Sequence, residues 1–265
     1  MRKPVMLFIG AGRMAEAMIA GLTSKKEQEI ERIIVSNQSN SIRLERLKQQ
    51  YGADTVFHWQ DHIKDADTIV LAVPPEEHEE IFTKLRGLVT TQLIVTIAAG
   101  IGPSKMEQAL PDSAVSWIMP NTASQIGQSM SLFCKGSKPL DDLQERSLTL
   151  LLDAIGHAEE CSEEEIHHLT AITGSAPAFV YLFAEVLIEK AKEYGIAESK
   201  AQKLVSLMIS GSAAMLNENG DPAFLREQVT TPGGSTAEGI KVLEKNEFAS
   251  VLKEAVTAVN KKALS

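Results

Sequence analysis

The N-terminal sequence reads Val5-Met6-Leu7-Phe8-Ile9-Gly10-Ala11-Gly12-Arg13-Met14-Ala15, an apolar run followed by a glycine-rich turn. Four consecutive apolar residues, Met6 to Ile9, are typical of a strand that is buried on both faces of a parallel sheet. Gly10 permits a tight turn, Gly12 lets the backbone approach a diphosphate, and Ala15 is small enough for close helix–strand packing. A G-x-G-x-x-A pattern between a strand and a helix therefore predicts a dinucleotide site.

The first half of the chain continues as an alternation of apolar strand patterns and helix patterns. Strands are expected at residues 33–36, 56–57, 67–75, 93–100, 115–119 and 130–133, and helices at 81–88, 104–110 and 140–152. Two pairs have the spacing of a capping box, Ser104 with Glu107 and Ser162 with Glu165, so each is expected to start a helix. The alternation predicts a doubly wound α/β sheet that ends near residue 156.

The second expected strand, residues 33–36, ends in a polar turn. Sites that take NAD usually carry Asp or Glu there, where the carboxylate accepts a hydrogen bond from the ribose 2′-hydroxyl. This chain instead has Ser36, Asn37 and Ser39, which can donate to a 2′-phosphate, and Arg43 follows. The turn favours NADPH over NADH as the cofactor; an ordinary polar loop is the alternative interpretation.

Near residue 160 the sequence pattern becomes helical throughout. Pro177 stands inside the first long helix, where it should bend the helix and free the carbonyl of Thr173. The run Ala178 to Ala191 is apolar on most of its circumference, as expected of a helix buried in an oligomer. We therefore expect a dinucleotide-binding domain over residues 1–160 and an all-α domain over residues 161–265.

Composition argues against several partner classes. The net charge of −9 disfavours nucleic acid and anionic membranes as partners. Cys134 and Cys161 have neither metal-ligand nor disulfide spacing, so a reducing cytoplasm is the expected location. No signal peptide is expected before the first strand, and no apolar run reads as long enough to span a bilayer. No metal site is expected either, and the histidines without partner spacing are assigned to the surface: His58, His62, His78 and His157.

A second segment rich in small and hydroxyl residues runs from Val229 to Gly239. Within it, Thr231, Gly233 and Gly234 precede a helix whose first residues are Ser235 and Thr236. Unpaired backbone N–H groups, the positive end of a helix dipole and short hydroxyls together make a good receptor for a small carboxylate. A turn followed by a capped helix is the alternative interpretation.

Five segments stand in order along the chain: Gly10-Ala11-Gly12-Arg13-Met14-Ala15, Ala98-Ala99-Gly100, Met119-Pro120-Asn121-Thr122, Thr173-Gly174-Ser175-Ala176-Pro177-Ala178, and Thr230-Thr231-Pro232-Gly233-Gly234-Ser235-Thr236 followed by Val242-Leu243-Glu244. Together they resemble the landmarks of the pyrroline-5-carboxylate reductase family over nearly the whole chain. The resemblance implies reduction of 1-pyrroline-5-carboxylate to proline with NAD(P)H. It also implies an α/β fold in which an N-terminal Rossmann-type doubly wound sheet is followed by an all-α dimerisation domain. The partner is then a second copy, in a homodimer that can build into a larger ring of dimers.

The resemblance also implies roles for individual residues. Thr236 is the expected catalytic residue, since a hydroxyl that orients the ring nitrogen suffices for an imine that itself protonates near neutral pH. The expected substrate-binding residues are Val229, Thr230, Thr231, Gly233, Gly234, Ser235, Thr236 and Ser175. The expected cofactor-binding residues are Gly10, Ala11, Gly12, Arg13, Met14, Ser36, Asn37, Ser39, Ala72, Val73, Pro74, Ala98, Ala99, Gly100 and Asn121.

The chain departs from the family pattern at five positions. The family usually has Lys, Asn, Arg, Pro and Gly where this chain has Pro74, Trp59, Trp117, Ala123 and Ala176. All but Ala176 lie in the expected cofactor domain, so they bear on cofactor preference and efficiency more than on the reaction. Two rival functions are another NADPH-dependent imine or hydroxyacid oxidoreductase of the same architecture and a non-catalytic NADPH-binding sensor.

Overall fold

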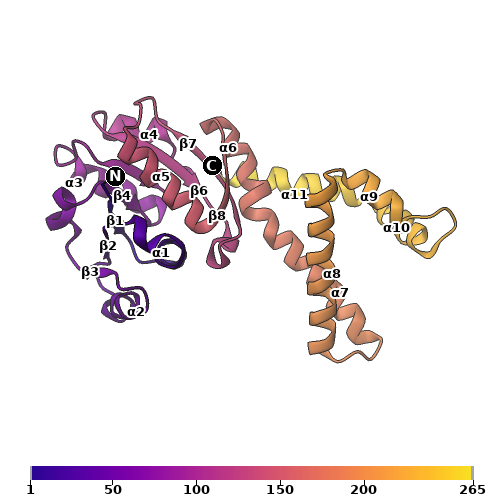
Figure 1. Ribbon diagram of the computed structural model, residues 1–265. Helices are drawn as coiled ribbons and strands as arrows, with labels where there is room; N and C mark the ends of the chain where they lie inside the picture. Colours follow the sequence, from indigo (N-terminus) through magenta and orange to yellow (C-terminus); the bar gives the residue numbers. More distant parts are fainter. Residues whose placement is uncertain (1, 264–265) are drawn as a thin grey trace. The chain divides into compact units, whose positions relative to one another are not determined.

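The computed structural model describes residues 2–263, without the side chains of residues 25–27. The chain separates into two compact units (Figure 1). The first, the sheet unit, runs through Gly174 and takes in the C-terminal segment from Asn260, and the second, the helical unit, is Ser175–Val259.

An eight-stranded sheet forms the centre of the sheet unit, with the strand order β3-β2-β1-β4-β5-β6-β7-β8. The strands are β1 Val5–Ile9, β2 Arg32–Ser36, β3 Asp54–Val56, β4 Thr68–Leu71, β5 Leu93–Thr96, β6 Ala114–Met119, β7 Ser129–Lys135 and β8 Gly156–Glu160. The strands β3, β2, β1, β4, β5 and β6 are all parallel to one another. Strand β7 runs antiparallel to β6, and β8 runs parallel to β7. The carboxyl ends of β1, β2, β4, β5 and β6 therefore meet at one edge of the sheet, which confirms the predicted α/β architecture.

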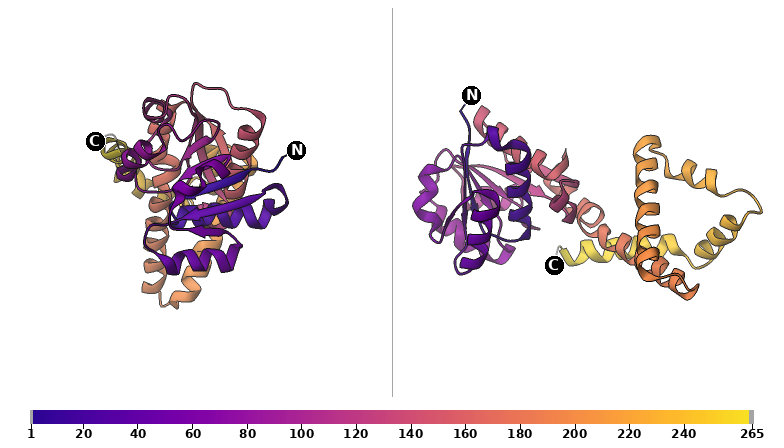
Figure 2. Two further views of the ribbon diagram at one scale, coloured as in Figure 1. Left: turned by 90° about the vertical axis from the view of Figure 1, so that its left-hand side faces the viewer. Right: turned by 60° about the horizontal axis from the view of Figure 1, so that its bottom comes forward.

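Helices cover both faces of this sheet (Figure 2). They are α1 Arg13–Lys26, α2 Ser41–Tyr51, α3 His78–Leu85, α4 Pro103–Ala109, α5 Asp142–Ile155 and α6 Glu163–Thr170, with short 3-10 turns η1 Glu27–Glu29, η2 Trp59–Asp65, η3 Pro75–Glu77 and η4 Thr122–Ile126. Helices α1, α2 and α5 bury apolar side chains on one face, and α3, α4 and η2 do so on the other. At Gly21 of α1, an added Cβ would lie 2.0 Å from the Ala154 carbonyl oxygen of α5, so these two helices pack closely where only glycine leaves room.

The start of α4 differs from the sequence prediction. Gly102 is the N-cap and Pro103 occupies the first helical turn, so the capping box expected at Ser104 is wrong. Proline fixes φ near the helical value and needs no N–H partner there, which starts the helix before Ser104. The Ser104 backbone N–H and hydroxyl instead donate to Glu163 Oε2, at 3.0 and 2.6 Å. The second predicted box, Ser162 with Glu165, is confirmed.

The junction between α6 and the following helix is a π-helical turn, η5 Ala171–Ser175. Pro177 has no N–H to bond the Thr173 carbonyl, so the sequence predicts that this oxygen is free for another donor. Asn121 Nδ2 donates to it at 3.0 Å, which confirms the prediction and supplies the partner. Single π-helical turns within helices are frequently found at functional sites.

The helical unit contains α7 Ala176–Glu193, α8 Glu198–Asn219, α9 Pro222–Val229 and α10 Ser235–Lys245, and most of α11 Phe248–Ala263. Among its described residues, Ala201 and Val205 are the apolar side chains that are buried. Large apolar side chains on α7 and α8 are exposed, including Leu182 at 59% and Leu207 at 62%. Contrary to the sequence expectation, Glu163–Glu193 is long and apolar enough to cross a membrane, by length and composition alone.

Candidate functional site

The turn between β1 and α1 has the shape that a phosphate-binding loop requires. Gly10 has φ +106°, and a Cβ there would lie 2.3 Å from the Ala72 carbonyl oxygen, so only glycine fits. The first helical hydrogen bond of α1 runs from the Glu16 N–H to the Gly12 carbonyl, at 3.0 Å. The N–H groups that precede Glu16 therefore have no helical acceptor and are available to an anion at the positive end of the helix dipole.

Arg43, at the start of α2, holds this loop from outside. Its Nε donates to the Ala11 carbonyl at 2.8 Å, and one terminal nitrogen donates to the Gly12 carbonyl at 3.2 Å. The same guanidinium pairs with the Glu16 carboxylate at 2.7 Å, and both side chains are mostly buried. Arg43 is thus engaged with loop carbonyls and a carboxylate, which makes it a support of the loop more than a cation held ready for phosphate.

A hollow of about 300 Å³ lies beside the loop, at the carboxyl ends of β1, β2 and β4. It brings together expected cofactor residues from three separate segments of the sequence. Its lining residues are Ile9, Gly10, Ala11, Gly12, Ser36, Asn37, Gln38, Ser39, Trp59, Ala72, Val73, Pro74, Glu77 and Ile81. Trp59 and Glu77 were not expected among them; Trp59 is 3% exposed and replaces a polar family residue with an aromatic wall.

The polar turn after β2 offers fewer donors than its sequence suggests. Ser36 is buried, and its hydroxyl donates to the Phe57 carbonyl at 3.3 Å. Asn37 Oδ1 accepts the backbone N–H groups of Ser39 and Asn40, at 3.2 and 2.8 Å, which fixes the turn. For the Asn37 Nδ2 and the Ser39 hydroxyl, the described residues supply no hydrogen-bond partner, so these two donors remain for a ligand.

The loop after β5 carries the expected cofactor residues Ala98, Ala99 and Gly100, and both backbone polar groups of Ala98 are held. The Thr96 hydroxyl accepts the Ala98 N–H at 3.2 Å, and Trp117 Nε1 donates to the Ala98 carbonyl at 2.9 Å. Trp117 is 1% exposed, so the residue that departs from the family pattern is part of the loop's support.

Asn121, after β6, also uses its side chain within the protein. Its Oδ1 accepts the Ala123 N–H at 2.9 Å, and its Nδ2 donates to the Thr173 carbonyl. Arg13 and Met14, two further expected cofactor residues, stand in the first turn of α1, where Arg13 is exposed. No group of three or more His, Cys, Asp or Glu in the described chain could hold a metal ion.

His78 corrects the sequence analysis, which placed it at the surface. The residue is completely buried on α3, where Ile81, Phe82 and Leu85 share its face. That spacing of three, four and seven residues is the signal that identifies the buried face of a helix. Burial lowers the pKa of His78, so the ring is neutral at ordinary pH.

The expected substrate residues belong to the helical unit, from Ser175 to Thr236. Gly234 is the N-cap of α10, and no side chain of the described residues caps it. Thr236 is exposed in the first turn, two residues past the cap, so its hydroxyl does not have the position of a capping group. The Thr230 hydroxyl donates to the Arg226 carbonyl at 2.7 Å, whereas Val229 and Thr231 are exposed. The helix start is thus an open set of N–H groups and short hydroxyls.

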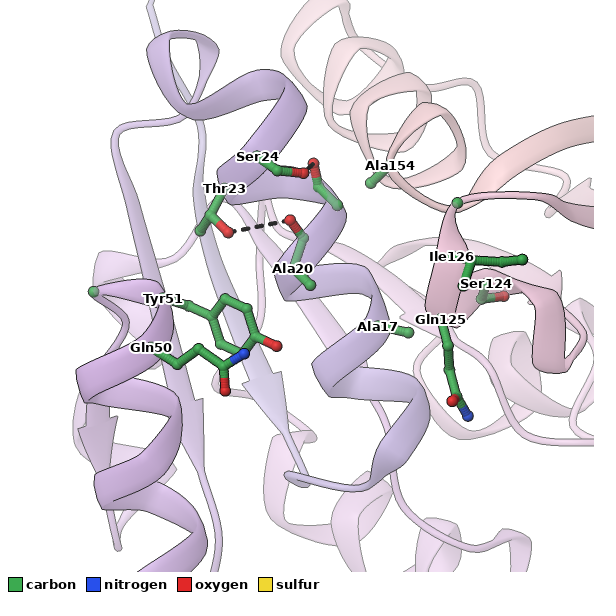
Figure 3. A pocket seen from close by; sticks show the side chains of 13 residues that line it. Ala17, Ala20, Thr23, Ser24, Gln50, Tyr51, Ser124, Gln125, Ile126 and Ala154 are labelled. Atoms are coloured by element: carbon green, nitrogen blue, oxygen red, sulfur yellow. Dashed lines mark hydrogen bonds between the residues drawn. The ribbon is translucent and has the colours of Figure 1, made fainter.

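A larger hollow of about 730 Å³ lies elsewhere on the sheet unit, between α1, the end of α2, η4 and α5 (Figure 3). The Thr23 hydroxyl donates to the Ala20 carbonyl and the Ser24 hydroxyl to the Gly21 carbonyl, so both are occupied by their own helix. The described residues that line it include no charged side chain. Size alone therefore does not identify the reaction site, because the glycine loop and its anion-binding amides face the smaller hollow.

Comparison with known proteins places both halves of the chain. Residues 163–265 match the family described as pyrroline-5-carboxylate reductase dimerisation, and residues 6–100 match NADP oxidoreductase, coenzyme F420-dependent. The chain is 33% identical over 259 residues to pyrroline-5-carboxylate reductase 1 of Bacillus subtilis, covering 97% of this chain and 87% of that protein.

Two solved structures resemble the whole chain. A pyrroline-5-carboxylate reductase from Coxiella burnetii is 29% identical with a TM-score of 0.88, covering 99% of this chain and 98% of that one. A pyrroline carboxylate reductase from Plasmodium falciparum, solved with NADP bound, is 25% identical with a TM-score of 0.87 and the same coverage.

Proposed function

This chain belongs to the pyrroline-5-carboxylate reductase family, and from that premise we propose that it reduces 1-pyrroline-5-carboxylate to proline, the last step of proline synthesis, with NADPH as reductant. The observation that carries the proposal is the similarity to pyrroline-5-carboxylate reductases over nearly the whole chain, together with an intact glycine loop. A fold-level likeness alone would leave the reaction open.

The residues around the smaller hollow fit a dinucleotide phosphate. At Gly10 the turn has no room for a Cβ, so the backbone itself lies open to the ligand. The N–H groups at the start of α1 lack helical acceptors. Asn37 and Ser39 supply donors for a 2′-phosphate, and no acidic side chain replaces them within the turn after β2. When bound, the reduced nicotinamide supplies the hydride.

For the substrate, we assign the carboxylate to the N–H groups at the start of α10, with Thr231 and the Gly233–Gly234 backbone around it. The Thr236 hydroxyl then faces the ring nitrogen and holds the imine in one orientation, so that the ring carbon presents one face for reduction. Since the imine is protonated near neutral pH, Thr236 needs to position the nitrogen and does not have to act as a strong acid. Ser175 lines the nicotinamide side in this scheme.

The residues from 163 onward form the oligomerisation region of the chain. We propose a homodimer, open to assembly into a ring, in which a second copy covers the exposed apolar faces of α7 and α8 and completes the active site. The apolar stretch Glu163–Glu193 is then buried by protein and not by lipid. In this division, residues 1–160 bind the cofactor in the cytoplasm and residues 161–265 bind the substrate and the second copy, without nucleic acid or membrane partners.

The direct test is to follow NADPH absorbance with and without 1-pyrroline-5-carboxylate and to measure the proline formed. The proposal requires one proline for each NADPH consumed, and no consumption without the imine. Binding of NADPH without turnover, or turnover with a 2-hydroxy acid in place of the imine, contradicts it and returns the chain to one of the two rival functions.

A further inference from the structure

His78 is the one histidine of the described chain that is completely buried, and it connects two loops at the cofactor edge of the sheet. Its Nδ1 lies 3.1 Å from the Pro74 carbonyl oxygen, in the loop after β4. Its Nε2 lies 2.8 Å from the Thr96 hydroxyl, at the end of β5. The sequence analysis marked Pro74 but neither His78 nor Thr96, so it did not predict this link between the two loops.

The hydrogen positions in this network follow from the chemistry of its ends. The Pro74 carbonyl can only accept, so His78 Nδ1 carries the proton and Nε2 of the neutral ring accepts from the Thr96 hydroxyl. The Thr96 oxygen in turn accepts the Ala98 N–H at 3.2 Å. The result is a single chain of hydrogen bonds that runs in one direction from Ala98 through Thr96 and His78 to Pro74, in which both ring nitrogens of His78 have a partner.

The two ends of this chain are cofactor elements. Pro74 lines the hollow beside the glycine loop, and Ala98 opens the loop that carries Ala99 and Gly100. The next peptide group is held by Trp117 Nε1, which donates to the Ala98 carbonyl, so both the N–H and the carbonyl of Ala98 are fixed. A shift of the His78 ring would therefore move the loops after β4 and β5 relative to each other.

We propose that His78, acting through Thr96, is a positioning residue that sets the separation of the β4 and β5 loops for the dinucleotide. The inference rests on the proposed function only in taking this edge as the NADPH site. His78 touches neither cofactor nor substrate, and its effect passes through the Pro74 carbonyl and the Ala98 peptide. A buried apolar ring in its place would fill the space but leave both loops without their common link.

The test compares His78→Phe and Thr96→Val with the double variant, using NADPH affinity measured by fluorescence in the absence of substrate. Thr96→Val removes the link with almost no change of volume and His78→Phe with a modest increase, so we expect NADPH affinity to fall roughly tenfold in each. Because both changes break the same chain, the double variant should lose no more than the larger single effect. Thr96→Ser, which keeps the hydroxyl, should recover most of the affinity lost in Thr96→Val.

The control is Phe82→Leu, one turn along the buried face of α3, with its ring edge-on to His78 at 5.7 Å. It should lower the melting temperature as much as His78→Phe while leaving NADPH affinity and the KM for NADPH unchanged. In His78→Phe and Thr96→Val the loss should fall on the KM for NADPH, with the KM for the imine within about twofold of normal. A folded His78→Phe protein with normal NADPH affinity, or additive losses in the double variant, overturns the positioning role. Wild-type protein that binds NADPH but does not reduce the imine overturns the proposed function and leaves this affinity pattern intact.

Discussion

Two helix starts in this chain have the same local design and opposite surroundings. Both α1 and α10 follow glycine-rich turns, and both offer unpaired N–H groups at the positive end of a helix dipole. At Gly10 a Cβ would lie 2.3 Å from backbone, whereas at Gly233, with φ +75°, a Cβ would meet no atom within 4 Å. The turn before α1 is thus packed against other parts of the sheet unit, whereas the turn before α10 has open space around it within the helical unit. The difference fits the proposal that the sheet unit by itself forms the phosphate cradle, while the substrate site needs further protein around it.

The sharpest way to break the enclosed site is Gly10→Ala. The new methyl group meets the Ala72 carbonyl and the residue keeps a positive φ, which together cost about 4 kcal/mol. We expect NADPH affinity to fall on the order of 1000-fold in a titration. The control Gly239→Ala, inside α10 with open space around it, should leave affinity unchanged and stabilise the helix by up to about 1 kcal/mol. Equal affinities for the two variants would show that the cradle does not hold the phosphate.

Leu182→Asp tests whether the open site depends on a second copy. A charge on the exposed apolar face of α7 should prevent association at a cost of about 3 kcal/mol or more, so turnover falls more than 100-fold at low protein concentration. NADPH affinity should stay normal, because the residues assigned to the dinucleotide phosphates all lie in the sheet unit. Sedimentation gives the assembly state of the same samples, and Ile42→Asp, at a still more exposed apolar position of α2, is the control. A monomeric Leu182→Asp protein with full turnover would remove the shared site from the mechanism.

Thr236→Ala tests the chemistry of the open site. Deleting a positioned donor costs roughly 3 kcal/mol, about 100-fold in kcat/KM for the imine, with NADPH affinity nearly constant. Thr236→Ser should retain more, since it keeps the oxygen. Gly234 is the N-cap, so the melting temperature should not show the loss of a cap, about 1 kcal/mol. A lower melting temperature with normal turnover would instead give Thr236 a structural role.

Arg43→Met gives the smallest of the four effects and asks how much the loop support contributes. The variant loses the donations to the Ala11 and Gly12 carbonyls, so NADPH affinity should fall about tenfold. Arg46→Met also loses an ion pair with Glu16 but touches no loop carbonyl, and it should leave affinity within about twofold. Similar losses in both variants would assign the effect to Glu16 and not to the loop.

The parts of this molecule that sequence reasoning predicted are those whose cause is local. The β1–α1 turn follows from a four-residue apolar run and three small residues, and the free Thr173 carbonyl follows from Pro177 alone. The partner of that carbonyl, Asn121, could not be inferred, because the contact joins residues 52 positions apart. Strand β8 was missed because its residues are polar and only partly buried, so pairing with β7 and not a hydrophobic pattern makes it a strand.

The same distinction between local and long-range causes applies at the cofactor edge. The glycine loop and the turn after β2 were assigned by motif, and both line the hollow. Trp59 and His78 carry no motif, and their roles arise from which loops the sheet order brings together. Ser104 shows the opposite case: its capping-box pattern with Glu107 is local and recognisable, but Pro103 starts the helix before Ser104, so the box does not form.

The placement of Arg43 has a consequence for ionic strength. Its guanidinium is bound to loop carbonyls and to Glu16. The described residues that line the cofactor hollow therefore include no cation, and the chain as a whole has a net charge of −9. A polyanionic dinucleotide then approaches a repelling long-range field, and the lining residues offer it backbone amides, a helix dipole that acts over one turn, and the neutral donors of Asn37 and Ser39. Salt screens the repulsion over about 10 Å at 0.1 M but hardly weakens those short contacts. Cofactor affinity in this protein should therefore hold or rise as salt is added, the opposite of a site that relies on surface lysines and arginines.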